Sequence, residues 1–454
     1  QMWLIRHYRL FRLLTMSGID LKLFRNIQKM YSRRRYCCFW LLISLCFVHS
    51  FGEERYATRS FSANIRTVKV ELIGNPLADP VIELKGNEQL LLSFDEMSYE
   101  TKSFNYSIVH CNADWTPSSL AEVEYVDGFL SGTIDDYEQS ISTTVLYTNY
   151  QLTLPNDDMK FKLSGNYAVE IYEDGNRENV LATLCFSVID PLVVIEADVR
   201  SNTDVELSRR FQQVDFSILN DGLPLQDPFS ELKVFVLQNG RYDNAATNLK
   251  PTYTSLNKQT YVNNKQLIFE GGNEYRSIDF SSVYTYGNGI QRIVFDRQND
   301  VYHVELLPDL LRVENGYDFY FDADGKYVVN KQISDDDRCE ADYMWVHFSV
   351  PMENIRFDGL VYLLGEMQGN LQYRITPMDY NFDTRCYEKS LFLKQGGYNY
   401  MYLFLPKNEQ KGTLQYIEGS YWQTVNTYQI FVYYRPRGSR YDQLIGLKTL
   451  KKSF

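Results

Sequence analysis

The chain has 454 residues, enough for two to four domains, each with its own hydrophobic core. Aromatic residues make up 15% of it, including 36 tyrosines, and this composition favours strands over helices. The formal net charge of −12 argues against a nucleic-acid partner, because phosphate binding requires clustered Lys and Arg.

The first 52 residues differ from the rest and have the layout of a secretory signal peptide. A basic cluster at residues 33–35 precedes an apolar run from Tyr36 to Val48, and we expect cleavage near Ser50. The run is shorter than the roughly 20 apolar residues of a membrane-spanning helix. We expect translation to start at Met30, with lipidation at Cys46 and a retained membrane anchor as the alternatives to cleavage. Removing residues 1–52 takes away nine basic residues and one acidic residue, which leaves 37 basic and 57 acidic and a net charge of −20.

Residues 61–190 read as short strands separated by turns, and we predict an N-terminal β-sandwich there. Alternating apolar side chains predict strands at 65–73 and 104–110. Two further alternating runs flank the turn Glu173-Asp174-Gly175-Asn176, which predicts a hairpin. Pro191 interrupts the pattern and is the expected first boundary.

A middle β domain with long polar loops is predicted over 191–333, ending in a hairpin at Phe319 to Val329. The acidic run at 334–338 is the second expected boundary, and 334–454 reads as a C-terminal sandwich. Its six expected strands lie at 343–350, 360–364, 371–375, 387–393, 398–405 and 427–434. The predicted fold class is therefore all-β, with tandem β-sandwich (Ig-like or early-set) domains and little helix.

Four cysteines follow the signal segment: Cys111, Cys185, Cys339 and Cys386. Their even number in an oxidising compartment allows two disulfides, and unpaired thiols are the alternative. Alternation places Cys111 and Cys185 on the outer faces of their strands.

We expect no enzyme, cofactor, metal or small-molecule substrate. His110, His303 and His347 each lack a second His or a Cys at ligand spacing, and packed or hydrogen-bonded histidines are the simpler interpretation. The run Asp322-Ala323-Asp324-Gly325 lacks the remaining ligands of an EF-hand and reads as a turn. Paired carboxylates for glycoside hydrolysis remain open in the acidic loops, because their separation depends on the fold.

The block from 104 to 172 is rich in aromatic side chains within predicted loops. Such side chains either close the ends of a sandwich core or form a recognition surface, since Trp and Tyr are enriched at binding hot spots. The residues considered for partner binding are Asp114, Trp115, Tyr125, Phe129, Tyr147 and Tyr150.

Several long motifs resemble the type IX secretion system plug protein family of Bacteroidota. They are HCNADW (110–115), EYVDGF (124–129), DYEQS (136–140), TTVLYTNYQLTLPNDDMKFKLSGNY (143–167), YEDG (172–175), EADYMWVHFS (340–349) and EGSYWQTVNTYQIFVYYRPRGSRYDQLIG (418–446). The resemblance covers nearly all of the chain after the signal segment, with the middle third the least distinctive. The C-terminal third also resembles an early-set, Ig-like sandwich, although the loop after Gly365 lacks the Trp typical of sugar-binding members.

The resemblance implies a periplasmic subunit, associated with the outer membrane through its partner. The expected role is to occlude the pore of a large outer-membrane translocon barrel through protein–protein contacts. The alternative is an exported glycan-binding protein similar to a carbohydrate-binding module, motivated by the aromatic loops and the early-set resemblance. The two hypotheses differ in the expected partner, a barrel protein or a sugar.

Overall fold

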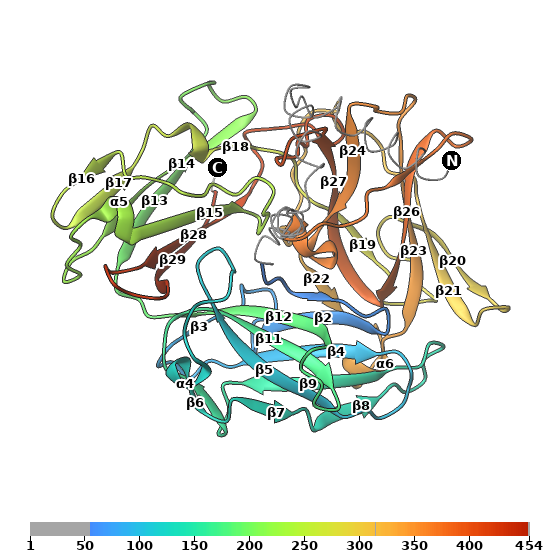
Figure 1. Ribbon diagram of the computed structural model, residues 1–454. Helices are drawn as coiled ribbons and strands as arrows, with labels where there is room; N and C mark the ends of the chain where they lie inside the picture. Colours follow the sequence, from blue (N-terminus) through green and yellow to red (C-terminus); the bar gives the residue numbers. More distant parts are fainter. Residues whose placement is uncertain (1–54, 314, 453–454) are drawn as a thin grey trace, which may run out of the picture. The chain divides into compact units, whose positions relative to one another are not determined.

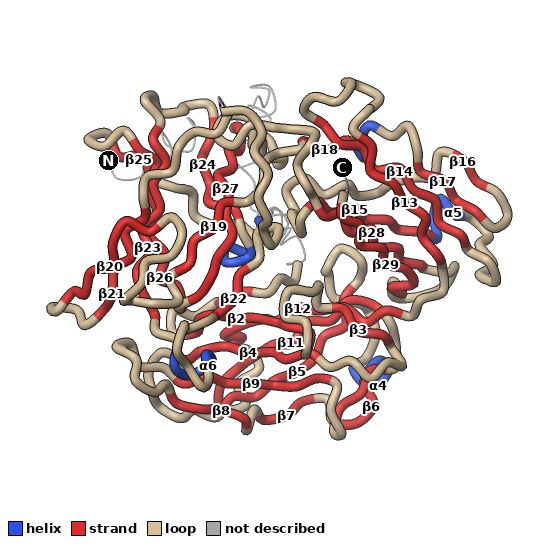
Figure 2. The backbone as a smooth tube through the Cα atoms, turned by 180° about the vertical axis from the view of Figure 1, so that it is seen from behind, coloured by secondary structure: helices blue, strands red, loops and turns tan. Residues whose placement is uncertain are grey.

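The computed structural model describes residues 55–313 and 315–452, in which nearly all of the regular secondary structure is strand (Figure 1). The helices in this part are α4 (Glu122–Tyr125), α5 (Pro228–Glu231), α6 (Asp337–Glu340), η1 (Lys265–Leu267) and η2 (Glu366–Leu371). Each is short, and Figure 2 shows them as isolated blue turns among the red strands. The predicted all-β class is confirmed. The predicted signal peptide lies outside the described residues.

The N-terminal sandwich contains the first twelve strands. They are β1 (Arg59–Ser60), β2 (Ile65–Leu72), β3 (Val81–Glu83), β4 (Leu90–Glu96), β5 (Phe104–Cys111), β6 (Val126–Gly128), β7 (Ser131–Thr133), β8 (Asp136–Gln139), β9 (Thr148–Leu154), β10 (Met159–Phe161), β11 (Gly165–Glu173) and β12 (Val180–Ile189). One sheet has the order β1-β12-β11-β5-β7, with β3 parallel to β12, and the other has the order β2-β4-β9-β8. Side chains from both sheets, such as Phe94, Tyr150 and Val169, share one core.

The hairpin predicted around residues 173–176 is confirmed. Strands β11 and β12 pair antiparallel, with Ile171 opposite Ala182. Asp174 and Gly175 both have positive φ, at 51° and 72°, and form a turn within the loop, in which the Asn176 N–H donates to the Glu173 carbonyl at 3.0 Å.

The middle sandwich combines strands from two distant parts of the chain. It contains β13 (Val194–Arg200), β14 (Phe211–Leu219), β15 (Leu232–Gln238), β16 (Tyr253–Thr254), β17 (Lys258–Tyr261), β18 (Ile268–Glu270), β28 (Thr427–Tyr434) and β29 (Gln443–Lys451). Strand β15 pairs along its whole length with β28, which pairs in turn with β29. The core places Val214 and Phe216 of one sheet against Val234 and Ile430 of the other.

The inserted sandwich lies in sequence between these two parts. It contains β19 (Arg276–Asp279), β20 (Ile290–Asp296), β21 (Val301–Leu306), β22 (Tyr327–Val329), β23 (Tyr343–Pro351), β24 (Gly359–Leu364), β25 (Asp379–Asn381), β26 (Cys386–Lys394) and β27 (Gly396–Pro406). One sheet is β19-β27-β22 with β24 also on β27, and the other is β20-β21-β23-β26-β25. Strand pairing therefore runs across the boundary expected near residue 333.

Two local expectations in this region are wrong. Residues 319–321 form no strand, and β22 pairs with β27 instead of closing a hairpin on them. The Asp322 carboxylate accepts hydrogen bonds from the backbone N–H groups of Tyr275 and Asp324, which fixes this loop without a strand partner. The strand expected at 371–375 is irregular chain that follows η2.

Candidate functional site

The three sandwiches surround a cleft of about 1490 Å³. The N-terminal sandwich contributes Arg59, Arg66 and Trp115 to its lining, while the inserted sandwich contributes Tyr373 and Phe392. The middle sandwich adds Tyr242 and Gln429. Because all three sandwiches line the cleft, its shape depends on the contacts that join them.

The Asp95 junction joins the N-terminal sandwich to the inserted one. The Asp95 carboxylate is fully buried and pairs with Lys394 Nζ at 2.7 Å. It also accepts hydrogen bonds from Tyr343 Oη at 2.6 Å and from Asn149 Nδ2 at 2.7 Å. The Lys394 ammonium lies 4.1 Å from the centre of the Tyr147 ring, which adds a cation–π contact. Both oxygens of the Asp95 carboxylate and the Lys394 ammonium therefore have hydrogen-bonding or ionic partners.

A second set of contacts extends the same junction along the loop before β9. The Asp342 carboxylate accepts hydrogen bonds from the backbone N–H groups of Thr144 and Val145, at 2.8 and 3.0 Å, and from the Thr144 hydroxyl at 2.7 Å. Tyr147 Oη donates to the Ala341 carbonyl at 2.7 Å. Residues 144–147 are therefore held by the chain segment that leads into β23.

The Asp442 junction joins the N-terminal sandwich to the middle one. Residues of the motif HCNADW (110–115) provide the contacts from the N-terminal side. Residues 112–116 form a turn in which the Asn112 N–H donates to the Thr116 carbonyl at 2.7 Å. This turn presents the Ala113 N–H to the buried Asp442 carboxylate at 3.0 Å. Asp442 also pairs with Lys233 Nζ at 2.9 Å and with Arg435 Nε at 2.7 Å.

Asn166 strengthens the Asp442 junction from the neighbouring strand β11. Its Oδ1 accepts a hydrogen bond from Tyr433 Oη at 2.9 Å, and its Nδ2 donates to the Asn112 carbonyl at 3.0 Å. Both Asn166 and Tyr433 are buried. The motifs HCNADW and SGNY, which are far apart in sequence, therefore meet at one inter-sandwich contact.

Three of the six residues considered for partner binding are core residues in this structure. Tyr125, Tyr147 and Tyr150 are buried, and the Tyr125 hydroxyl donates to the Ile108 carbonyl at 2.9 Å. The Tyr150 ring stacks on Phe94 at 5.3 Å between ring centres. Tyr125 and Tyr150 thus have the core-closing role, the first of the two considered, and Tyr147 is buried in the Asp95 junction between two sandwiches. None of the three is exposed for contact with a partner.

The other three residues are more accessible. Phe129 has 68% of its surface exposed, on the turn between β6 and β7. Trp115 is half-buried over the cluster of Cys111, Ala168 and Cys185, and it lines the cleft. Burial acts to raise the pKa of Asp114, but hydrogen bonds from the Thr116 N–H and hydroxyl hold that pKa below its ordinary value. Asp114 is therefore an ionised turn residue.

Among the described residues, Cys111, Cys185, Cys339 and Cys386 are free thiols. Cys111 and Cys185 lie outside the main core, in the cluster beneath Trp115 and Tyr56. Strand β11 separates their strands, β5 and β12. Two strand spacings are about 9–10 Å, beyond the roughly 7 Å that a disulfide can bridge.

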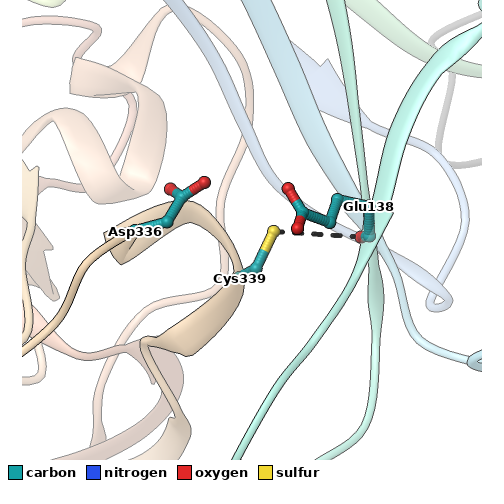
Figure 3. Close-up of side chains that lie close together, drawn as sticks. All are labelled: Glu138, Asp336 and Cys339. Carbon is teal, nitrogen blue, oxygen red and sulfur yellow. Dashed lines mark hydrogen bonds between the residues drawn. The ribbon is translucent and has the colours of Figure 1, made fainter.

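Glu138, Asp336 and Cys339 form one cluster of potential metal ligands within 4.8 Å of one another (Figure 3). However, Arg338 Nε donates to Asp336 Oδ1 at 2.8 Å, so a cation already neutralises this carboxylate. Burial, followed by the charges of Glu138 and Asp336, raises the pKa of the Cys339 thiol to about 12. Metals bind the thiolate, so this cluster suits a structural contact between β8 and α6 better than a metal site.

His110 is buried just before the turn formed by residues 112–116. Its Nε2 lies 3.3 Å from the Ser164 carbonyl oxygen, and the rings of Tyr125, Tyr167 and Tyr441 surround it. Burial lowers the pKa of His110 to about 4, despite the opposing effects of the Ser164 carbonyl and Asp442. The folded protein therefore keeps this imidazole neutral below the pH at which an unfolded chain protonates it.

We expect His110 to make the folded protein less stable in acid. Between pH 6.5 and pH 4 the unfolded state takes up a proton that the folded state refuses, so the stabilising contribution is complete above pH 6.5 and is lost on acidification. A shift from 6.5 to about 4 corresponds to roughly 3 kcal/mol over this window. The variant His110→Gln should show a smaller slope of unfolding free energy against pH, measured by urea titration. Tyr441→Phe keeps the imidazole and its ring contact, so its slope should equal that of the wild type; an unchanged slope in His110→Gln would contradict the prediction.

Nothing in the local sequence marks Asp95, Lys394 or Asp442 as residues that join two sandwiches. Their partners lie far away along the chain: Asp95 and Lys394 are separated by 299 positions in sequence, and Ala113 and Asp442 by 329. The long motifs around these residues indicate which segments of the chain matter to the structure. They do not indicate which atoms of those segments are in contact.

Comparisons with known proteins agree with this architecture. Residues 65–190 match the family model described as the type 9 secretion system plug protein first domain, which is the N-terminal sandwich. The chain is also similar to a crystal structure of a hypothetical protein from Parabacteroides merdae ATCC 43184, with 43% sequence identity and a TM-score of 0.85. That match covers 88% of this chain and 100% of the other. A comparison with curated proteins gave no match. With its first sandwich matching the family model and its motifs joining that sandwich to the rest, the chain belongs to the type 9 secretion system plug protein family.

Proposed function

We propose that this protein is a periplasmic gating subunit of a type IX secretion system. It occludes the pore of a large outer-membrane translocon barrel while no cargo is engaged, and it acts through protein–protein contacts without catalysis. Family membership supports a role in type IX secretion. Within residues 55–313 and 315–452, no helix is long and apolar enough to cross a membrane.

The observation that best supports a plugging role is the pair of buried polar junctions. A plug must keep its shape while it is held in a pore and pressed from one side. At Asp95, an ion pair with a fully buried carboxylate joins the N-terminal sandwich to the inserted one. At Asp442, a fully buried carboxylate of the middle sandwich accepts a hydrogen bond from the Ala113 N–H of the N-terminal sandwich. Such junctions resist relative motion better than the polar, weakly packed contacts usual between domains.

A plug must also be released, which favours a wet interface with a few aromatic anchors. Phe129 is the exposed aromatic residue among those considered for partner contact, and Val123 nearby in sequence has 61% of its surface exposed. We therefore assign the first partner-contact role to the surface around Phe129, together with Asp114 and Trp115 at the cleft.

Deleting the gene should increase the uptake of a membrane-impermeant dye across the outer membrane, because the translocon barrel is left open. The wild-type gene should restore the barrier, and Phe129→Ala should restore it less well. Leu256→Ala is the matched control, since Leu256 has 89% of its surface exposed but lies on the middle sandwich. Unchanged permeability in the deletion strain, with the barrel still present, would overturn the plugging role.

Affinity purification followed by imaging of the complex distinguishes this role from glycan binding. Copurification of a very large outer-membrane barrel supports the plug. Specific binding to one sugar on a glycan array, with no barrel recovered, would instead support the glycan-binding alternative.

A further inference from the structure

His303 and His347 are 44 residues apart in sequence but meet on one face of a sheet. Strands β21 and β23 are parallel neighbours, and His303 Nδ1 lies 2.9 Å from His347 Nε2. The two ring planes differ by only 7°. The two imidazoles are therefore hydrogen-bonded to each other at the outer face of the inserted sandwich.

The outer nitrogen of each imidazole faces an oxygen atom. His347 Nδ1 lies 2.7 Å from the Ser390 hydroxyl on β26, and His303 Nε2 lies 4.0 Å from an Asp296 carboxylate oxygen on β20. In metal sites, oxygen atoms at this position fix the tautomer and orient the ligating ring. Four neighbouring strands thus contribute to the arrangement.

Glu305 carries a carboxylate on the same face of the sheet, and its side chain must rotate away from Arg292 to bring an oxygen within ligand distance of both imidazoles. It follows His303 by two positions on β21, which puts both side chains on one face, and it is directly opposite His347 in the parallel register. The Glu305 carboxylate now pairs with Arg292 through two hydrogen bonds of 2.6 and 2.8 Å. The Arg292 side chain is 60% exposed, and exposed ion pairs contribute little free energy, so Glu305 is readily released.

We propose that His303, His347 and Glu305 bind a divalent transition metal ion of the zinc class. Two histidines and one carboxylate are a common ligand set for such ions, and they leave positions open for water or for a partner's side chain. Two imidazole nitrogens on a tetrahedral zinc ion, each about 2.0–2.1 Å from it, are separated by about 3.3 Å. Small rotations of the two rings are enough to reach this separation from 2.9 Å.

A neutral imidazole is the metal-binding form, and metal affinity decreases in acid as imidazoles become protonated. Asp296, Glu305 and Arg292 are the other charged groups on the adjacent strands β20 and β21.

Isothermal titration of the purified protein with zinc chloride at pH 7.5 tests the site. We expect one ion per chain with micromolar affinity, and visible absorption bands of a histidine-ligated ion when cobalt replaces zinc. His303→Gln or His347→Gln should weaken binding at least tenfold, and Glu305→Gln should weaken it less. Binding should also weaken at pH 5.5.

A double variant, Glu138→Gln with Cys339→Ser, is the matched control for the cluster in Figure 3 and should bind zinc as the wild type does. Loss of binding in this variant, or wild-type affinity in both histidine variants, would overturn the proposal. So would the absence of any binding to a wild-type protein whose circular dichroism shows it folded. None of these results depends on the plugging role.

Discussion

Replacing Asp95 with alanine is expected to destabilise the protein by about 3–5 kcal/mol, because it leaves the Lys394 ammonium buried without its counter-ion. The Lys394 side chain is only 2% exposed, so water cannot replace the lost carboxylate. Tyr343 Oη and Asn149 Nδ2 would also lose their acceptor. Urea denaturation followed by tyrosine fluorescence measures the change.

Two further variants show whether burial is the cause. Lys258→Ala removes one partner of an exposed ion pair with Glu196 and should cost less than about 1 kcal/mol. Asp95→Leu combined with Lys394→Met removes both charges, and it should recover much of the stability lost in Asp95→Ala, since apolar pairs often replace buried ion pairs at little cost. A loss below about 1 kcal/mol in Asp95→Ala would show that the junction carries no such energy.

The Asp95 junction also predicts where the structure would open first in that variant. Thr144, Val145 and Tyr147 are held by the segment that contains Asp342. With Lys394 unpaired, backbone amides in 140–150 should exchange with deuterium faster, while those of the middle sandwich should keep wild-type rates. Mass spectrometry of the exchanged peptides distinguishes this local opening from global unfolding.

The strand pattern of the N-terminal sandwich could be predicted because it is local. Alternation in β5 and in the β11–β12 hairpin places Phe104, Tyr106 and Ile108 in the core, and the structure confirms it. A strand can be recognised from the alternation of apolar and polar side chains over a few consecutive residues. A turn such as Asp174-Gly175 can be recognised from its residue types, because Asp and Gly adopt positive φ more readily than most residues.

The pairing of distant strands could not be predicted in this way. Strand β15 alternates in the same manner whether its partner is a neighbour or, as found, β28 almost 200 residues later. The predicted hairpin at 319–329 failed for the related reason that β22 pairs with β27, while Asp322 is satisfied by backbone amides. Alternation identifies a strand and its buried face, but it does not identify the strand beside it.

The same limit applies to the functional residues. Aromatic residues in the 104–172 block were expected either to close a core or to form a recognition surface, and in the structure Tyr147 and Tyr150 are buried while Phe129 is exposed. Composition could not separate them, because a tyrosine that closes a core and one that binds a partner look alike in sequence. His303 and His347 looked isolated, since only the parallel pairing of β21 and β23 brings them together.

Replacing Asp442 with alanine is the corresponding test of the second junction, with an expected loss of about 2–4 kcal/mol. The loss should be smaller than in Asp95→Ala, because the side chains of Lys233 and Arg435 are 39% and 31% exposed and can be hydrated once unpaired. The Ala113 N–H, by contrast, would be left buried without an acceptor.

Two further variants serve as controls for this prediction. Asp442→Asn retains an acceptor for the Ala113 N–H and should give an intermediate loss of stability. Asp221→Ala, at an exposed turn, should stay within about 0.5 kcal/mol of the wild type. If Asp442→Ala also weakens copurification of the barrel while Asp221→Ala does not, the HCNADW turn serves binding by fixing the N-terminal sandwich in place. Wild-type stability in Asp442→Ala would instead mean that the other contacts of this turn, from Asn166 and Arg435 to Asn112, are sufficient to hold it.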